Sequence, residues 1–279
     1  MSPIRFLILS DTHDTAFPSL PISGPPIDVV LHCGDLTMIG GLSNYRRAIS
    51  SILSIPTQPH LVIPGNHDVS LDPERWASNL IEDEDDPEES ARALRLFEDV
   101  KQETKGRFAL LSEGFHRFEL DGGKSFTIYA SPYSPEFGGY AFSYTPEKDR
   151  FQGKIPDGVV ILMTHGPPSF GNRDGTTSYK LDLGRHGEHC GCEKLAKAVE
   201  KARPLIHCFG HIHKGYGVQR LKWERKEIED VKEEEKAGVT RLQVVGGDNR
   251  GKSTLLVNAA IMRRGEEKGN EPWIVDFHV

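Results

Sequence analysis

The sequence lacks several features that would each indicate a particular class of protein. Its four cysteines contain no C-x-x-C pair, because a single glycine separates Cys190 from Cys192, and this argues against a zinc knuckle or a thioredoxin-type site. No N-x-[ST] acceptor occurs. The first apolar run, residues 6–9, is too short for a signal peptide, and no run approaches the length of a membrane span. We therefore expect reduced thiols, no membrane partner and a location in the cytoplasm or nucleus.

The chain also lacks an excess of basic residues. It carries 34 Lys and Arg against 41 Asp and Glu, a net charge of -7, which argues against extended nucleic-acid binding. Small phosphate esters remain possible substrates, because bound metal ions supply positive charge locally. The 279 residues suffice for a core without disulfides, and no internal repeat or domain-sized linker is present. We expect a single domain over residues 1–279.

Apolar runs and helical spacing predict an alternation of strands and helices. Residues 43–53, 90–104 and 192–202 have the spacing of amphipathic helices. Residues 115–120 and 125–130 flank Asp121-Gly122-Gly123, which indicates a hairpin. Short apolar runs predict buried strands at 4–9, 29–32, 60–63, 159–163, 205–209, 241–245, 254–258 and 273–277. The pattern favours an α/β fold.

Two charged stretches interrupt this pattern. Residues 82–89 are acidic, and we expect them to be solvated within a helical cap near 73–105. Residues 222–237 are densely charged. We expect this second stretch to form a surface excursion that is helical or disordered.

Five polar motifs each follow an apolar run by one to four residues. They are Asp11-Thr12-His13, Gly34-Asp35, Gly65-Asn66-His67-Asp68, Thr164-His165 and Gly210-His211-Ile212-His213. Any one alone is more often a cap or a turn, but parallel strands would bring all five to one edge of a sheet. Mixed oxygen and imidazole ligands suit Mn, Fe or Zn, with Mg possible, and not a thiolate site. Asp35, central in the order, is the candidate to bridge two such ions.

The five motifs together resemble the signature of the calcineurin-like metallophosphoesterases, which runs D-x-H, G-D, G-N-H-[DE], H and G-H-x-H. Residues 164–168, 209–213 and 257–259 further resemble the small metallophosphoesterase-domain proteins that are similar to cyclic-nucleotide phosphodiesterases. This resemblance implies a four-layer sandwich of two mixed β-sheets flanked by helices, with the metals at the carboxyl edge of the strands.

The resemblance also implies roles for individual residues. One metal ion would be bound by Asp11, His13, Asp35 and His213, and the other by Asp35, Asn66, His165 and His211. His67 would face the leaving group and, as an imidazolium, either stabilise the phosphorane charge or protonate the departing oxygen. Asp68 would orient the His67 ring. We expect a metal-bound hydroxide to attack a phosphodiester directly, with a cyclic nucleotide as one candidate substrate. The alternatives are a phosphomonoesterase, including a phosphoprotein phosphatase, and a non-catalytic metal-scaffold binding module.

One motif favours a different function. Residues 246–253 match G-x-x-x-x-G-K-[ST], the phosphate-binding P-loop, and follow a predicted strand. Only 26 residues remain after Ser253, however, which is too few for the βα units that follow a P-loop in its own fold. In the resemblance to the metallophosphoesterases, residues 253–259 correspond to a strand, so we expect a strand there and not a P-loop.

Overall fold

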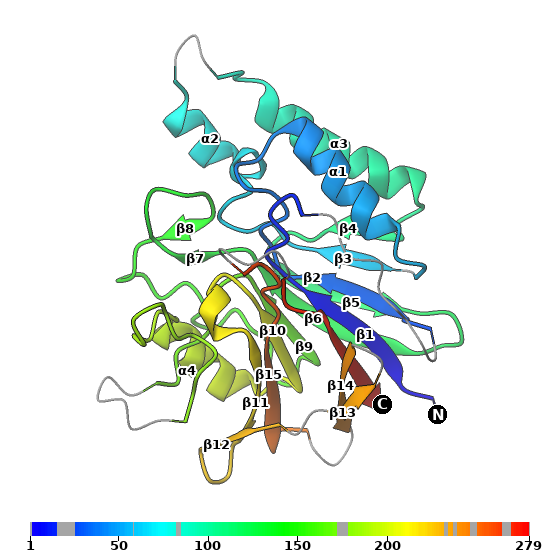
Figure 1. The fold of residues 1–279 in the computed structure, drawn as a ribbon, viewed down its shortest axis with the longest axis vertical. Coiled ribbons are helices and arrows are strands. Elements are labelled where there is room, and N and C mark those ends of the chain that lie inside the picture. Colours follow the sequence, from blue (N-terminus) through cyan, green and yellow to red (C-terminus); the bar gives the residue numbers. More distant parts are fainter. Residues whose placement is uncertain are drawn as a thin grey trace.

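The computed structural model describes residues 2–15, 26–57, 59–81, 85–171, 178–231, 234–236, 239–245, 250–263 and 269–278. Two seven-stranded sheets lie face to face, and helices cover their outer faces (Figure 1). Helices α1 and α3 cover one sheet, and α4 lies beyond the other. The predicted four-layer α/β sandwich is confirmed.

Four parallel strands form one half of the first sheet. The sheet order is β13-β14-β16-β1-β2-β3-β4. β1 to β4 run parallel, whereas β16 pairs with β1 in the antiparallel sense. The bounds are β1 (Ile4–Leu9), β2 (Val29–His32), β3 (His60–Val62), β4 (Phe108–Leu110), β13 (Glu234–Lys236), β14 (Val239–Val245) and β16 (Trp273–His278).

The second sheet is built in the same way around four parallel strands. Its order is β12-β11-β15-β10-β9-β6-β5, and β6, β9, β10 and β15 run parallel. The bounds are β5 (Gly114–Glu119), β6 (Ser125–Ser131), β9 (Ile161–Thr164), β10 (Ile206–Phe209), β11 (Gly217–Lys222), β12 (Glu227–Asp230) and β15 (Ser253–Asn258). Each sheet therefore directs the carboxyl ends of several parallel strands toward one edge.

Amphipathic spacing explains how the helices pack. In α1 (Leu42–Leu53), the buried residues are Tyr45, Ala48, Ile49 and Ile52, which share one face. The amino end of α4 (Glu193–Ala202) is capped by the Cys192 sulfur, which accepts from the Leu195 N–H. The remaining elements are α2 (Pro73–Asn79), α3 (Glu89–Glu103), η1 (Val69–Leu71), η2 (His213–Gly215), β7 (Ser134–Pro135) and β8 (Ser143–Tyr144).

The main core lies between the sheets. β1 contributes Phe6 and Ile8 from one side, and Ile161 and Ile206 of β9 and β10 oppose them from the other, all fully buried. Strands that are buried on both faces read as continuous apolar runs. This is why the sequence predicts β1 and β2 with their observed bounds.

The structure corrects one prediction and bears on three others. The charged stretch 222–237 is not helical in its described part: β11 ends at Lys222 and pairs with β12 as an antiparallel hairpin. Of the P-loop match, residues 246–249 lie outside the described residues, and Ser253 begins strand β15 where a P-loop would begin a helix. The cap near 73–105 contains α2 and α3, with residues 82–84 outside the described part. Among the described residues, no helix combines the length and apolar character needed to cross a membrane.

Candidate metal centre

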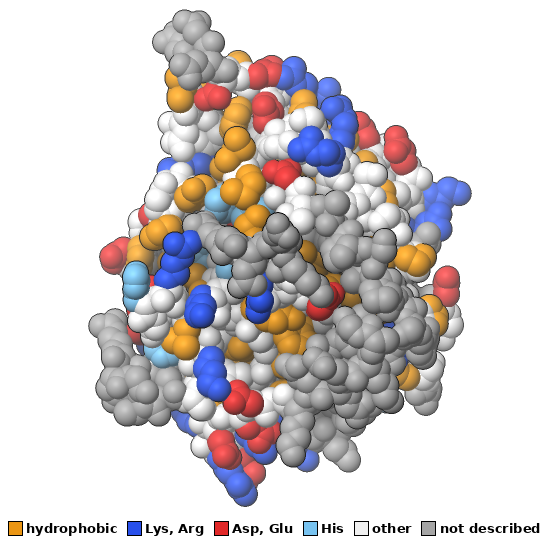
Figure 2. Space-filling view, in the orientation of Figure 1, with side chains coloured by type: hydrophobic (Ala, Val, Ile, Leu, Met, Phe, Trp, Pro, Cys, Tyr) orange, Lys and Arg blue, Asp and Glu red, His pale blue; other side chains and the backbone are white. Residues whose placement is uncertain are grey.

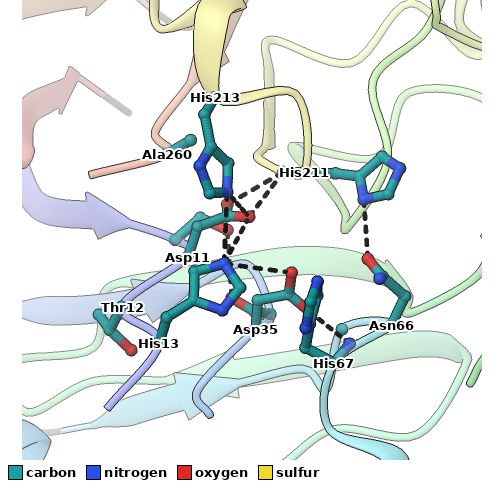
Figure 3. A network of polar contacts seen from close by, with 12 residues as sticks. Asp11, Thr12, His13, Asp35, Asn66, His67, His211, His213 and Ala260 are labelled. Carbon is teal, nitrogen blue, oxygen red and sulfur yellow. Dashed lines mark hydrogen bonds and ion pairs between the residues drawn. The ribbon is translucent and has the colours of Figure 1, made fainter. Parts of the chain in front are cut away.

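The five motifs lie in loops at the carboxyl ends of parallel strands from both sheets. Asp11, Asp35 and Asn66 follow β1, β2 and β3 of the first sheet, while His165 and His211 follow β9 and β10 of the second. A bridge between Ser10 and Ala260 joins the end of β1 to the segment after β15. The side chains from these loops converge on one another (Figure 3).

The loops adopt backbone conformations that side chains rarely favour. Asp11, His13, Asp35 and His211 have φ values of 57°, 44°, 55° and 67°, in the left-handed region. Such residues are uncommon and gather at functional sites, where the surrounding structure holds them in place. Four of the seven predicted ligands are therefore held in a strained conformation.

Two glycines of the motifs allow the backbone to approach the carboxylates closely. A Cβ at Gly65 would lie 2.3 Å from both the amide nitrogen and Oδ1 of Asp35. A Cβ at Gly210 would lie 2.0 Å from Oδ2 of Asp11. No side chain fits at either position without moving a predicted ligand, which explains why the motifs contain glycine there.

One group of possible ligands consists of Asp11, His13 and His213. The Nε2 atom of His213 lies 3.1 Å from Oδ1 of Asp11 and 3.3 Å from Nε2 of His13. One donor atom from each residue falls within 4.8 Å of the others. A carboxylate oxygen and two imidazole nitrogens thus surround a common point.

A second group consists of Asp35, His165 and His211. Nε2 of His165 lies 3.4 Å from Oδ1 of Asp35. The amide oxygen of Asn66 lies 2.8 Å both from Nε2 of His165 and from Nδ1 of His211. All four residues of the second predicted ligand set therefore meet.

Asp35 stands between the two groups. Its Oδ1 faces His165 of the second group at 3.4 Å, and its Oδ2 faces His13 of the first at 3.6 Å. The Asp35 side chain is 2% exposed. A carboxylate that offers one oxygen to each group has the geometry of a ligand that bridges two ions.

Backbone carbonyls fix the tautomers of two histidines. Nδ1 of His13 donates to the carbonyl oxygen of Thr37 at 3.2 Å, and Nδ1 of His165 donates to that of Cys33 at 2.9 Å. A carbonyl can only accept, so Nδ1 carries a proton in both rings and Nε2 is the nitrogen left to bind a metal ion. Carbonyl partners of this kind are typical of metal-binding histidines.

The charges at the centre favour a cation between the carboxylates of Asp11 and Asp35. Burial alone would raise the pKa of Asp11, but its hydrogen bond to His213 and the neighbouring imidazoles hold that pKa well below its usual range. Burial opposes the charge of His165, yet the Asp35 carboxylate raises its pKa to about 9. In contrast, burial and the charge of His165 lower the pKa of His211 to about 4. The donor set fits divalent ions, which would take the place of the proton on His165.

His67 lies beside the two groups and not within them. The backbone N–H of His67 donates to Oδ1 of Asp35 at 2.8 Å. The His67 ring packs edge-on against the His13 ring, with 4.8 Å between centroids. Nδ1 of His67 donates to the carbonyl oxygen of Met38 at 2.7 Å, so Nε2 is the ring nitrogen left for other partners. The side chain is partly exposed.

Asp68 has a different role from the one expected. Burial and the charge of Asp35 raise its pKa to about 7. Its oxygens accept from Gly65 N, Leu36 N, Thr37 N and Thr37 Oγ1, at 2.8, 3.1, 3.0 and 2.9 Å. Asp68 therefore ties the second motif loop to the third, and the Met38 carbonyl takes the orienting role at His67. That part of the prediction for Asp68 was wrong.

Two residues outside the predicted ligand sets also contribute to the site, and one of them, Tyr140, was not identified from the sequence. His32 is wholly buried; it accepts from the Gly34 N–H and bonds Thr12 through Nε2, so it braces two motif loops. Tyr140 packs on His67 with 4.5 Å between ring centroids. Nothing in the order of motifs points to Tyr140, because it comes from a separate loop near β7 and β8.

Comparisons with known proteins show the family of this chain. The profile of the calcineurin-like phosphoesterase family matches residues 4–215. The human protein called metallophosphoesterase domain-containing protein 1 is 33% identical over 220 residues, which is 77% of this chain and 62% of that protein. A UPF0046 protein of Caenorhabditis elegans is 31% identical over 225 residues, 77% of this chain and 52% of that protein.

A further relative and a solved structure complete the comparison. A probable rhamnogalacturonate lyase C of Emericella nidulans is 32% identical over 223 residues, 79% of this chain but only 18% of that protein. This chain thus spans less than two thirds of these relatives. One crystal structure covers 92% of this chain, and this chain covers 91% of it, with a TM-score of 0.50 and 14% identity, a likeness of fold alone.

Proposed function

We propose that this chain, which belongs to the calcineurin-like phosphoesterase family, hydrolyses phosphodiesters with two divalent metal ions held at the centre described above. The observation that carries the proposal is the position of Asp35, which offers one carboxylate oxygen to each ligand group. Asp11, His13 and His213 would hold one ion together with Asp35. Asn66, His165 and His211 would hold the other, again with Asp35.

The bound ions would supply Lewis-acid chemistry, since a metal pair activates water and neutralises phosphate charge. The chain itself orients the ligands. The carbonyl oxygens of Thr37 and Cys33 keep His13 and His165 in the tautomer whose Nε2 faces the site. Asp68 holds the loops of Asp35 and Asn66 together. The donor set suits Mn, Fe or Zn.

His67 is the proposed general acid. Its Nδ1 proton is committed to the Met38 carbonyl, so in the imidazolium form Nε2 carries the proton available to a departing alcohol oxygen. General acid catalysis of this kind contributes about 10²–10⁴-fold to the rate. An alkoxide is a poor leaving group from a diester and from a monoester alike, so a general acid would assist the hydrolysis of either ester. The preference for a diester rests on the resemblance of residues 164–168, 209–213 and 257–259 to the phosphodiesterase-like subgroup.

His67→Ala tests the proposal. We expect the variant to keep its metal content, measured by elemental analysis, while kcat on an unactivated alkyl phosphodiester falls at least a hundredfold. His116→Ala removes a histidine on β5 and is the matched control, which should retain wild-type turnover. Wild-type turnover by His67→Ala would refute the role of His67.

The substrate class needs its own comparison. The metal-loaded protein is assayed on bis(4-nitrophenyl) phosphate and on 4-nitrophenyl phosphate. A larger kcat/KM for the diester supports the proposal, and a larger value for the monoester identifies a phosphomonoesterase. Metal binding without turnover of either ester would indicate a binding module.

A further inference from the structure

The two loops that contact His67, one at Met38 and one at Tyr140, carry exposed apolar side chains. Met38, Ile39 and Phe137 are 40%, 70% and 76% exposed, and Tyr140 is half-buried against the His67 ring. We call these four residues the apolar rim. Hydrophobic side chains lie next to histidine side chains on this face (Figure 2). Single exposed apolar residues are ordinary, but a group of them beside a polar centre marks a place where a ligand or partner binds.

The His67 ring lies between the metal centre and the rim. On one side, the His67 ring packs against His13, a predicted ligand, with 4.8 Å between centroids. On the other side it packs against Tyr140 at 4.5 Å, with the two ring planes tilted by 37°. Tyr140 therefore lies one ring beyond the proposed general acid. A substrate group that extends from the metal centre past His67 would lie next to Tyr140.

Hydrogen bonds hold the Tyr140 loop in place. The Ala141 N–H donates to the carbonyl oxygen of Asn66, a predicted ligand, at 3.1 Å. Nε of Arg75 donates to the Gly139 carbonyl at 2.8 Å. The Phe142 N–H donates to Oδ2 of Asp72, also at 2.8 Å. The loop is thus fixed to the metal centre and to the start of α2.

The Met38 loop is held just as firmly. Thr37 donates to Asp68 from both its N–H and its hydroxyl group, and the Met38 N–H donates to Oδ2 of Asp14 at 3.0 Å. Two anchored loops therefore present the rim, and little ordering is required when a ligand binds. Such preorganisation favours affinity.

We propose that the apolar rim binds an aromatic group attached next to the phosphorus of the substrate, and that Tyr140 stacks on this group. This inference rests on the proposed function and narrows its substrate class. The metal centre recognises the anionic end of the ligand, whereas the rim offers uncharged, apolar surface beyond His67. A ligand that fits both is charged at one end and flat and apolar at the other.

Binding of phenylphosphonate and methylphosphonate tests the proposal without turnover. Both carry the same anionic head and differ only in the phenyl ring. We expect the metal-loaded protein to bind phenylphosphonate about tenfold more tightly by calorimetry, as expected for one stacked ring. Tyr140→Ala should reduce this preference to less than twofold. Tyr140→Phe keeps the ring and should keep the preference.

Phe115→Ala is the matched control, because Phe115 is an exposed ring on the edge strand β5. It should bind both phosphonates as the wild type does. Equal affinity of the wild type for the two phosphonates, or a preference that survives in Tyr140→Ala, would overturn the rim proposal while the proposed function stands. The proposal would also be overturned if the rim increased the affinity for AMP but not for phenylphosphonate. In AMP a sugar separates the aromatic base from the phosphorus. If neither phosphonate binds, the proposed function itself fails.

Discussion

Several buried histidines outside the ligand groups are held neutral. His207 on β10 is one of them: it bonds the Thr164 hydroxyl group through Nε2 at 2.9 Å, and its Nδ1 has no hydrogen-bond partner. Thr164 donates its own proton to the Gly166 carbonyl, so Nε2 of His207 must be the donor. Burial lowers the pKa of His207 to about 3. A charge on this ring would have no compensating partner.

This burial makes stability depend on pH. The unfolded chain binds a proton at His207 near pH 6.5, whereas the folded chain does so near pH 3. Between these values the unfolded state holds more protons, so the free energy of unfolding falls as the pH decreases, by up to about 1.4 kcal/mol per pH unit. His207→Gln keeps an N–H donor and removes the titration. Urea unfolding at pH 7, 6 and 5 should give a shallower slope for the variant, and identical slopes would contradict this account.

The sequence predicts the ligand residues better than it predicts the residues around them. Asp11, Asp35 and His165 each follow a recognisable strand, so their meeting could be foreseen from the parallel order. Asp68 lies in the same motif as His67, yet its carboxylate turns to the backbone of a loop some thirty residues earlier. Such a contact depends on how two loops face each other in space, and adjacency in the sequence does not reveal it.

At the scale of elements, an ion pair joins the first and last strands. Arg5 of β1 lies directly opposite Asp276 of β16. Nε and Nη2 of Arg5 donate to the two carboxylate oxygens at 2.6 and 2.7 Å, and the two side chains are 8% and 11% exposed. When an ion pair is this buried, removing one partner strongly destabilises the fold.

Loss of one partner should therefore cost much of the stability. Asp276→Ala is expected to lower the free energy of unfolding by about 3–5 kcal/mol, because Arg5 stays buried without its carboxylate. Glu98→Ala removes the acidic partner of Lys101 in a pair that is about half exposed, and should cost under about 1 kcal/mol. Chemical denaturation measures both values. Equal losses in the two variants would show that burial does not strengthen the first pair.

Strands buried on both faces were predicted, and so was the edge strand β5 as part of a hairpin, whereas the charged edge strand β12 was not. β1 and β2 are continuous apolar runs, which leaves little choice of structure. The hairpin of β11 and β12 is densely charged because β12 is the edge strand of its sheet. Ile228 packs partly on the core from this strand, while Glu227 and Asp230 are exposed. Charges on an edge strand disfavour pairing with the strands of other chains. The charges that led us to expect a helix or disorder therefore belong to an edge strand.

At the scale of the whole molecule, the metal centre joins the two sheets. The first group takes Asp11 and His13 from the loop after β1 and His213 from η2, which follows β10 of the other sheet. The second group takes Asp35 from one sheet and His165 from the other. Bound ions would therefore couple the sheets at one edge, in addition to the apolar core between them.

Metal ions should thus stabilise the entire fold and not one loop. A ligand at a hundred times its Kd adds about 2.7 kcal/mol, so each ion raises Tm by on the order of 5–10 °C in a chain of this size. Chelation should reverse the rise. Asp35→Asn should abolish most of it, since Asp35 faces both groups, and Asp121→Asn on the β5–β6 turn is the control. Hydrogen exchange should show added protection after β2 and after β10 alike. Protection confined to one sheet would mean that the ions do not join them, and the bridging role of Asp35 would then lose its structural basis.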